Sequence, residues 1–293
     1  MAAAGGGGEL ARLPASVIQA LGPVDFASAT LLGTGWQVTA YRAGDWVIRV
    51  PRTPAGGATT ERQTRLYQRL ASARMPVPRD ARVVRGPDGA VALGLYRYIS
   101  GRPATHEMRG GDLARALARF LAALHAYPTA GIGDCCEVLE DLWAGRFAAR
   151  WERCRPRLER SLTGWLGPVI ERFLAGGGGA GVPPVLVHGD LGEEHVLVDA
   201  AGRLEGIIDF SGPRITDPAL DFGALIERFG WPFAGATLSA YGSADPGLVR
   251  RARFYADVRP LASIELGLRY GSEPKVMEGL ERLAARRRAS GAE

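Results

Sequence analysis

Lysine is almost missing from this chain of 293 residues, in which Lys275 is the one lysine and arginine supplies every other Lys/Arg position. Any role that needs a permanent cation earlier in the chain therefore falls to arginine, whose planar guanidinium keeps its charge without a partner. The bias, with its abundant alanine and glycine, is typical of a GC-rich bacterial gene and does not by itself indicate a binding function.

Cysteine and long apolar runs are also scarce. Three cysteines, Cys135, Cys136 and Cys154, are an odd number without metal-ligand spacing, which favours reduced structural thiols in a cytoplasmic protein. No apolar run approaches the roughly 20 residues that span a bilayer, so we expect no membrane partner. The segment Met1–Gly8 is alanine and glycine after its methionine, without signal-peptide character. We expect residues 1–9 to be a disordered tail.

The chain is basic, with a net charge of +5 and a sequence pI near 9.4. Its charge is spread over the whole length, and the one dense run, Arg286–Arg288, sits on the last expected helix. A solvated helix face explains that run. We therefore expect no nucleic-acid partner. The chain is also expected to be a monomer.

The first third of the chain favours a small sheet. Short apolar runs bounded by glycine and aspartate turns predict strands, at Ala29–Leu32, Val38–Arg42, Trp46–Val50, Arg82–Arg85 and Val91–Ile99. Amphipathic patterns predict helices at Leu10–Leu21 and Thr59–Ser72.

The rest of the chain favours helices with a short sheet inserted. Helices are expected at Asp112–Ala126, at Val138–Leu174 as two helices broken near Gly164–Pro168, and from Pro218 onward, at Ala219–Phe229 and within Arg250–Leu283. The prediction is an α+β fold of two lobes, a β-rich lobe at residues 10–99 and a mostly helical lobe at residues 102–293, with a hinge at about 95–101.

The most informative segment is Val187–Asp199, followed by Gly206–Phe210. It predicts strands that end in two acids, Asp190 and Asp209, with the nitrogen ligand His195 between them. Phosphoryl transfer needs such a set, because one acid orients a hydroxyl while the other, with a further ligand, holds Mg²⁺ against nucleotide phosphates.

Together with His188-Gly189-Asp190, the runs Ile207–Gly212 and Thr216–Phe222 closely resemble the aminoglycoside phosphotransferase family, a branch of the protein-kinase-like fold. The resemblance extends from Gly33 to about Leu283. It implies a catalytic role for Asp190 on the acceptor hydroxyl and Mg²⁺ binding by Asp209. The second metal ligand of the family is usually asparagine, and this chain has His195 there, as do the 2''-acting aminoglycoside kinases and the macrolide kinases.

The resemblance also implies a site for ATP or GTP. Gly33, Thr34 and Gly35 lie between two expected strands, where backbone N–H groups cover phosphates; an ordinary hairpin is the alternative. Arg49 takes the place of the kinase lysine, and Gln63 takes the place of its glutamate partner. Tyr96 or Tyr98, at the hinge, would stack on the purine.

The acceptor is expected to be a hydroxylated antibiotic. The landmarks Phe229–Trp231 and Arg269–Gly271 most resemble the 2''-phosphotransferase branch, whose members bind polycationic sugars with carboxylates. The expected substrate-binding residues are Glu193, Glu194, Asp221, Glu227, Glu265 and Tyr270. A macrolide kinase is the second interpretation, because Arg49 and the segment Gly189–Leu197 resemble that group as well. The helix after Asp221 is less acidic than in the 2''-phosphotransferase branch, which weakens charge steering of a cationic drug.

Other residues near these motifs have a structural interpretation. His188 is expected to brace the backbone, and His125, which resembles a helix terminus of the family, is expected to be structural. Asp217 is expected to cap the helix that begins near Pro218. The pair of Arg49 and Gln63 also motivates a catalytically silent nucleotide-binding module, whereas Asp190, His195 and Asp209 favour an enzyme.

Overall fold

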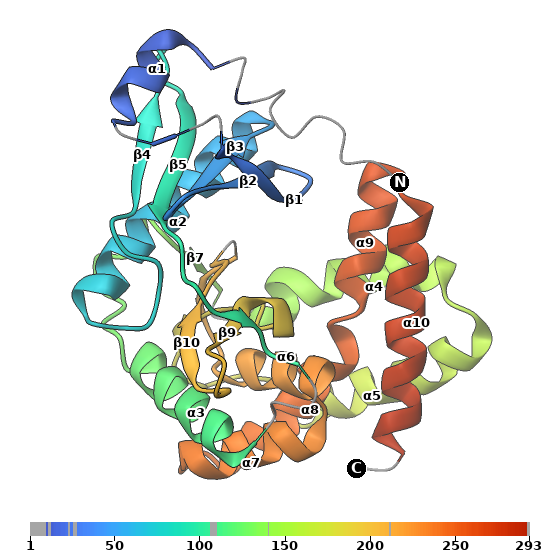
Figure 1. Cartoon of the computed structure of the whole chain (residues 1–293). Helices are drawn as coiled ribbons and strands as arrows, with labels where there is room; N and C mark the ends of the chain where they lie inside the picture. The colour runs from blue at the N-terminus through green and yellow to red at the C-terminus, as the bar shows by residue number, and fades with distance from the viewer. Residues whose placement is uncertain are drawn as a thin grey trace. The chain divides into compact units, whose positions relative to one another are not determined.

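The structure is a computed structural model that describes residues 10, 13–22, 24–25, 28–105, 110–139, 141–210 and 212–291. The predicted tail at residues 1–9 lies outside the described residues. The chain forms two compact units, the first of residues 1–102, 196–201 and 205–211, and the second of residues 103–195, 202–204 and 212–293. The expected lobe boundaries, with a hinge at 95–101, stay a prediction. The predicted α+β class is confirmed (Figure 1).

The first unit is built on a five-stranded antiparallel sheet with the order β1-β2-β3-β5-β4. Its strands match the predicted apolar runs to within a few residues, at β1 Thr30–Thr34, β2 Val38–Ala43, β3 Trp46–Pro51, β4 Arg82–Arg85 and β5 Val91–Arg97. The helices of this unit are α1 (Ala15–Ala20) and α2 (Pro54–Ser72).

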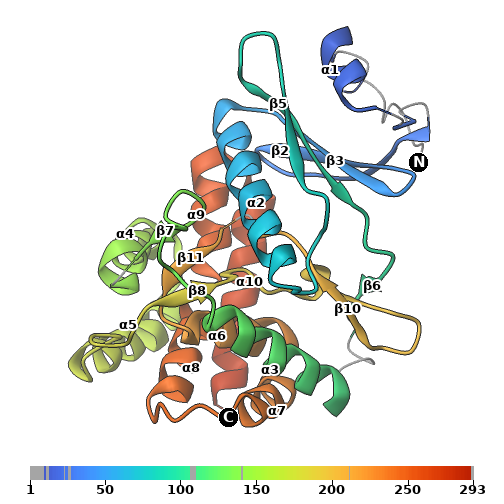
Figure 2. The same ribbon diagram turned by 90° about the vertical axis from the view of Figure 1, so that its left-hand side faces the viewer.

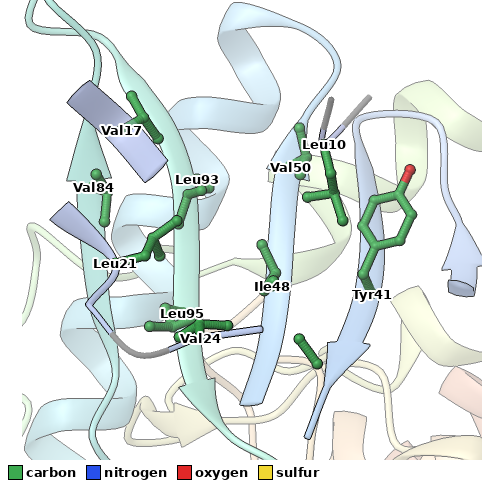
Figure 3. Close-up of a cluster of buried hydrophobic side chains, with 11 residues drawn as sticks. Leu10, Val17, Leu21, Val24, Tyr41, Ile48, Val50, Val84, Leu93 and Leu95 are labelled. Carbon is green, nitrogen blue, oxygen red and sulfur yellow. The ribbon is translucent and has the colours of Figure 1, made fainter. Parts of the chain in front are cut away.

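Alternation along β3 and β5 gives the sheet two different faces. Ile48, Leu93 and Leu95 are buried with Val17 of α1 and with Leu21, which follows this helix, in one apolar cluster (Figure 3). The residues that alternate with these on β3 and β5 face α2. On β5, a Cβ on Gly94 would stand 2.5 Å from Cγ2 of Thr60, a residue of α2. Arg49, between Ile48 and Val50, therefore belongs to the face that α2 covers.

Helix α2 begins earlier than the apolar pattern predicted. Thr53 is its N-cap, with Oγ1 accepting the Gly56 N–H at 3.1 Å, and Pro54 fills the first helical position. Both features favour a start before Thr59, because a hydroxyl cap satisfies an unpaired N–H and proline has none to lose.

Two later strands join the first unit. β9 (Val196–Val198) pairs with β10 (Leu204–Ile207) and with β6 (Arg102–Pro103) in a sheet of order β10-β9-β6. The backbone N–H of Ile207 donates to Pro76 O at 2.8 Å. This contact anchors the end of β10, from which the chain runs directly into Asp209.

The second unit is mostly helical. Its helices are α3 Gly111–His125, α4 Ala148–Cys154, α5 Arg160–Ala175, α6 Ala219–Phe229, α7 Trp231–Tyr241, α8 Leu248–Val258, α9 Leu261–Tyr270 and α10 Glu273–Ser290, with a π-helix at Trp143–Phe147. Helix α6 packs on α8, α9 lies beside α10, and α3 lies beside α7 (Figure 2). A short sheet has the strand order β7-β11-β8, with β7 at Glu137–Val138, β11 at Arg214–Thr216 and β8 at Val185–Val187. The loop that carries Asp190 follows β8.

One predicted break in the helices is wrong. Pro168 lies inside α5, and the interruption falls at residues 155–159 instead, where a 3₁₀ turn Arg155–Arg157 precedes extended Leu158. The helical conformation ends at Leu158 and Glu159, which both have extended backbone. Within the described part of the chain, no helix is long and apolar enough to cross a membrane.

Candidate active site

The loop that carries Asp190 follows the buried strand β8. Gly189 has φ +80, and a Cβ there would lie 2.7 Å from Arg214 Nη1 and 2.8 Å from Gly212 O. Only glycine fits this close approach at a left-handed backbone conformation. The tight turn leaves the Asp190 side chain 56% exposed at the end of the strand, where it is able to meet a substrate.

Two buried groups fix the backbone of this loop. His188 is fully buried, and its Nδ1 accepts the N–H of Asp190 at 3.2 Å. The carboxylate of Asp221 accepts the N–H groups of His188 (3.0 Å) and Gly189 (2.8 Å). The expected bracing role of His188 is confirmed.

Asp221 is not placed to bind substrate, which corrects the sequence prediction. Its side chain is fully buried, and besides the two backbone N–H groups it pairs with His125 Nε2 at 3.1 Å. Burial alone would raise the pKa of Asp221, but the hydrogen bond and charge of His125, with His188, hold this pKa below its ordinary value. His125 is bridged in turn to the Tyr241 hydroxyl, so its expected structural role is also confirmed.

Arg259, at the end of α8, holds Asp190 from the other side. Its Nη2 donates to Asp190 Oδ1 at 2.9 Å and its Nη1 donates to Gly189 O at 3.1 Å. Burial opposes ionisation of Asp190, yet the charges of Arg259, His195 and His188 bring its pKa below the ordinary value. The carboxylate is therefore ionised and oriented, which suits alignment of a hydroxyl. Sequence reasoning missed Arg259, since nothing in its local pattern links it to a loop 69 residues earlier.

His195 ends a 3₁₀ turn at Glu193–His195. Its Nδ1 lies 2.7 Å from Asp190 O. Because a carbonyl oxygen only accepts, Nδ1 carries the proton, and Nε2 is the ring nitrogen with the lone pair that a metal would use.

Asp209 occupies an unusual backbone conformation in the first unit. It has φ +61, and its N–H donates to the Tyr67 hydroxyl at 2.9 Å. Its Oδ1 accepts from Arg49 Nη1 at 3.3 Å and from Gln63 Nε2 at 3.2 Å. Strained residues of this kind cluster at functional sites. Gln63 was expected to pair with Arg49, and both instead bind the same carboxylate oxygen.

The predicted nucleotide residues differ in how they are engaged. Gly33 and Thr34 end the exposed strand β1, and Gly35 N–H donates to Val38 O at 2.9 Å. The Gly35 amide is therefore used within the hairpin. The structure has the hairpin, which the sequence left as the alternative; phosphate covering by Gly33 and Thr34 stays a prediction.

Tyr96 and Tyr98, the two tyrosines expected to stack on the purine, are not equivalent. Tyr96 is only 7% exposed, and its ring meets that of Tyr67 edge-on at 5.3 Å. A purine cannot stack on a ring in this position, so the expected stacking role of Tyr96 is wrong. Tyr98 is partly exposed, and the Arg42 guanidinium lies 3.9 Å from its ring centroid.

Three of the carboxylates expected to bind a cationic acceptor, Glu194, Glu227 and Glu265, have an arginine partner. Arg282 contacts both oxygens of Glu227 at 2.8 Å, and the Glu227 side chain is 4% exposed. This burial contradicts a substrate contact. Glu194 is half exposed but accepts from Arg228 at 2.7 Å. These partners lie far away in sequence, so the local pattern did not reveal them.

Glu265 is paired twice, with Arg150 Nε at 2.8 Å and with Arg153. It is largely covered, with 23% of its side chain exposed. Three of the expected acceptor residues keep accessible surface: Glu193 to an intermediate degree, Glu194 at 51% and Tyr270 at 42%.

Asp217 caps α6 as predicted, since Oδ1 accepts the Ala219 N–H at 2.9 Å. It also accepts from Arg251 Nε at 2.7 Å and from the Tyr255 hydroxyl at 3.0 Å. Asp217 is buried, so its role is structural.

Comparison with known proteins agrees with this geometry. Residues 28–255 match the phosphotransferase enzyme family. Viomycin phosphotransferase of Streptomyces vinaceus is 35% identical over 98 residues, which are 32% of this chain and 34% of that protein. The uncharacterized protein YcbJ of Bacillus subtilis (strain 168) is 37% identical over 59 residues, 20% of this chain and 19% of that protein. The matches thus span 34% and 19% of these curated relatives' lengths.

Solved structures match over nearly the whole chain. The GDP complex of wild-type aminoglycoside 2'-phosphotransferase-IIIa has a TM-score of 0.79 at 25% identity, covering 93% of this chain and 96% of that chain. Macrolide 2'-phosphotransferase type I has a TM-score of 0.72 at 24% identity, covering 92% of this chain and 94% of that chain. The second likeness concerns the fold alone.

Proposed function

This chain belongs to the phosphotransferase enzyme family, whose match covers residues 28–255, and we propose that it moves the γ-phosphate of ATP or GTP to a hydroxyl group of an antibiotic. An aminoglycoside is the first candidate acceptor. The observation that carries the proposal is Asp190, an ionised and half-exposed carboxylate fixed by Arg259 and by the His188 ring. The GDP-bound relative supports a nucleotide donor.

Asp190 would align the acceptor hydroxyl and accept its proton. The new bond forms between the acceptor oxygen and the γ-phosphorus, while the bond from that phosphorus to the bridging oxygen breaks and the nucleoside diphosphate leaves. Positioning and electrostatics supply most of the rate gain in such reactions. The clamp of Arg259 on Asp190 Oδ1 and Gly189 O serves this positioning.

Mg²⁺ would be held by His195 and Asp209, and when bound it would neutralise phosphate charge. The donor chemistry fits: Asp209 offers a carboxylate on a backbone fixed by Tyr67, and the proton on His195 Nδ1 directs its lone pair to Nε2. Magnesium sites commonly use few protein ligands and take the others from phosphates and water.

In this proposal the β-rich residues 10–99 bind the nucleotide and residues 102–293 bind the acceptor, with a hinge at 95–101. Arg49 would neutralise phosphate charge, Gly33 and Thr34 would cover the phosphates, and Tyr98 would contact the base. Nucleoside triphosphates are available inside the cell, so the proposed reaction is cytoplasmic. A monomer is sufficient for it.

A macrolide is the second candidate acceptor, and the paired carboxylates favour it. Arg282, Arg228 and Arg150 each neutralise an acid that the aminoglycoside interpretation needed. A polycationic sugar gains little from an acid that already has a partner. Glu193 and Tyr270 remain the proposed acceptor contacts.

A coupled assay for nucleoside diphosphate release tests the proposal. Aminoglycosides and macrolides would be offered separately with ATP and with GTP, and Asp190→Asn would serve as the matched inactive variant. Acceptor-dependent release by the wild type alone supports the proposal. No stimulation by any hydroxylated antibiotic would favour a nucleotide-binding module without transferase activity.

A further inference from the structure

Arg214 is a buried arginine with too few partners. It is the first residue of β11, and its side chain is 12% exposed. Its Nε is buried and has no hydrogen-bond partner among the described residues. A guanidinium has five N–H donors. Burial without acceptors is costly, so its retention points to a ligand that the protein itself does not supply.

The carboxylate nearest to Arg214 is shared. Glu137 Oε2 lies 3.4 Å from Arg214 Nε without hydrogen-bond geometry, and the same oxygen accepts from Arg146 Nη1 at 2.9 Å. The Glu137 side chain is 53% exposed. One half-exposed carboxylate therefore serves two guanidinium groups, which leaves positive charge in excess.

The wider surroundings add to this excess. Burial, followed by the charge of Arg146 and then of Arg150 and Arg259, lowers the pKa of Arg214 to about 10, and Glu137 only partly opposes them. Within the described residues, the ion pairs of these arginines form three separate groups: Glu137 with Arg146 and Arg214, Glu265 with Arg150 and Arg153, and Asp190 with Arg259. Together they contain five arginines and three carboxylates.

Arg214 also lies against the loop of Asp190. Its Nη1 is 2.7 Å from where a Cβ on Gly189 would be, and its Nη2 is 3.2 Å from the corresponding point on Gly212. Arg259, which contributes to the low pKa of Arg214, donates directly to Asp190 and to Gly189 O. The under-neutralised guanidinium thus adjoins the proposed catalytic loop.

We propose that Arg214, with Arg146, forms an oxyanion-binding site beside Asp190 that takes a phosphate-like group. Guanidinium groups pair well with such anions, through parallel charge-assisted hydrogen bonds. The anion has two possible sources, the phosphoryl group after its transfer to the acceptor or an anionic group that the acceptor already carries. The proposal rests on the phosphotransferase function.

Thermal unfolding of the full chain with orthophosphate tests the site. Wild type and Arg214→Met are compared at constant ionic strength, with chloride as the balancing anion. We expect phosphate to raise the Tm of the wild type until the site is saturated. Arg214→Met should need at least about tenfold more phosphate for the same rise in Tm. Without phosphate, Arg214→Met should be as stable as the wild type or more so, since it removes a poorly paired buried charge.

Two further variants keep the test decisive. Arg287→Met removes an equally charged but exposed side chain of α10 and should respond to phosphate as the wild type does. Arg214→Lys keeps the charge and should retain part of the phosphate response. It replaces Arg214→Met in the test if Arg214→Met folds poorly. A wild type without a phosphate response, or an Arg214→Met variant that retains it in full, would overturn the proposal.

Kinetics distinguish the two sources. If the site holds the transferred phosphoryl group, Arg214→Lys weakens inhibition by the phosphorylated product while the acceptor KM is unchanged. If it holds an anionic acceptor group, KM rises for anionic acceptors only. Unchanged product inhibition together with unchanged KM would contradict the site. A wild type that binds phosphate but transfers none to any acceptor would instead contradict the proposed function.

Discussion

Arg49 and Asp209 form an ion pair, with Nη1 3.3 Å from Oδ1, although 160 residues separate them in sequence. Strand β3 supplies the cation, and the turn after β10 supplies the acid. The side chain expected to neutralise phosphates therefore contacts the side chain expected to hold the metal. Gln63 donates to the same oxygen. The neutral amide of Gln63 therefore stands where kinases have a glutamate, which would compete with Asp209 for the cation.

Replacing Arg49 with methionine should weaken nucleotide binding. The change removes the cation and leaves Asp209 with Gln63, and the loss of a charge-assisted contact predicts about a 10- to 100-fold rise in Kd for Mg·nucleotide. Calorimetric titration of ATP and GTP measures it. Arg85→Met, which removes an exposed arginine paired with Glu61 in the same unit, is the matched control. Equal affinities in all three proteins would remove Arg49 from the nucleotide site.

Arg259→Gln should lower kcat and leave nucleotide affinity intact. The variant loses the donors to Asp190 Oδ1 and Gly189 O, so the carboxylate is no longer held in line; we expect about a 10- to 100-fold loss. Arg259→Lys should recover part of the rate. The exposed Arg269→Gln, on the neighbouring helix α9, should behave as the wild type. A uniform loss of nucleotide affinity and kcat in Arg259→Gln would indicate a general structural defect instead.

His195→Asn should stay active, whereas His195→Leu should lose metal-dependent nucleotide binding. Asparagine offers an oxygen ligand, which Mg²⁺ prefers, and leucine offers none. Titration of Mg²⁺ at fixed nucleotide gives the apparent metal affinity of each variant. If His195→Asn folds well and is inactive, a ligand role for His195 is excluded.

Asp221 should make stability depend on acid pH. Its folded-state pKa is depressed, so its contribution is present above the unfolded value of about 4 and is lost as the pH falls through the lower folded value. Asp221→Asn should therefore be less stable than the wild type near pH 7, by about 2–4 kcal/mol for a buried group with charged partners. Urea unfolding at a series of pH values should show the two proteins converging in acid. If the two proteins differed by the same unfolding free energy at every pH, Asp221 would not be the source of a pH-dependent stability.

Local patterns predicted much of the fold because alternation and turn chemistry act over short distances. The strand predicted at Trp46–Val50 is observed as β3, Trp46–Pro51, and β4 was predicted with its observed bounds, Arg82–Arg85. The predicted order of Asp190, His195 and Asp209 likewise needed no tertiary information. Pro168 misled the helix prediction, because tertiary packing of α5 tolerates the proline and the break falls beside Pro156.

The parts that sequence did not predict depend on distant partners. Glu227 and Glu265 read as free acids until the fold brought Arg282 and Arg150 to them. Asp221 read as a substrate contact, although His125, 96 residues away, is its partner. Arg214 and Arg259 carried no local signal, since an isolated arginine in a loop or at a helix end is usually solvated.

The mass of the acceptor after reaction tests the central claim most directly. Each antibiotic would be incubated with Mg²⁺ and ATP or GTP, with the wild type and with Asp190→Asn in parallel, and analysed by mass spectrometry. The account predicts that the wild type adds the mass of one phosphoryl group to at least one hydroxylated antibiotic and that Asp190→Asn adds it several orders of magnitude more slowly. Equal phosphorylation by both proteins, or none by a wild type that binds nucleotide, would contradict it.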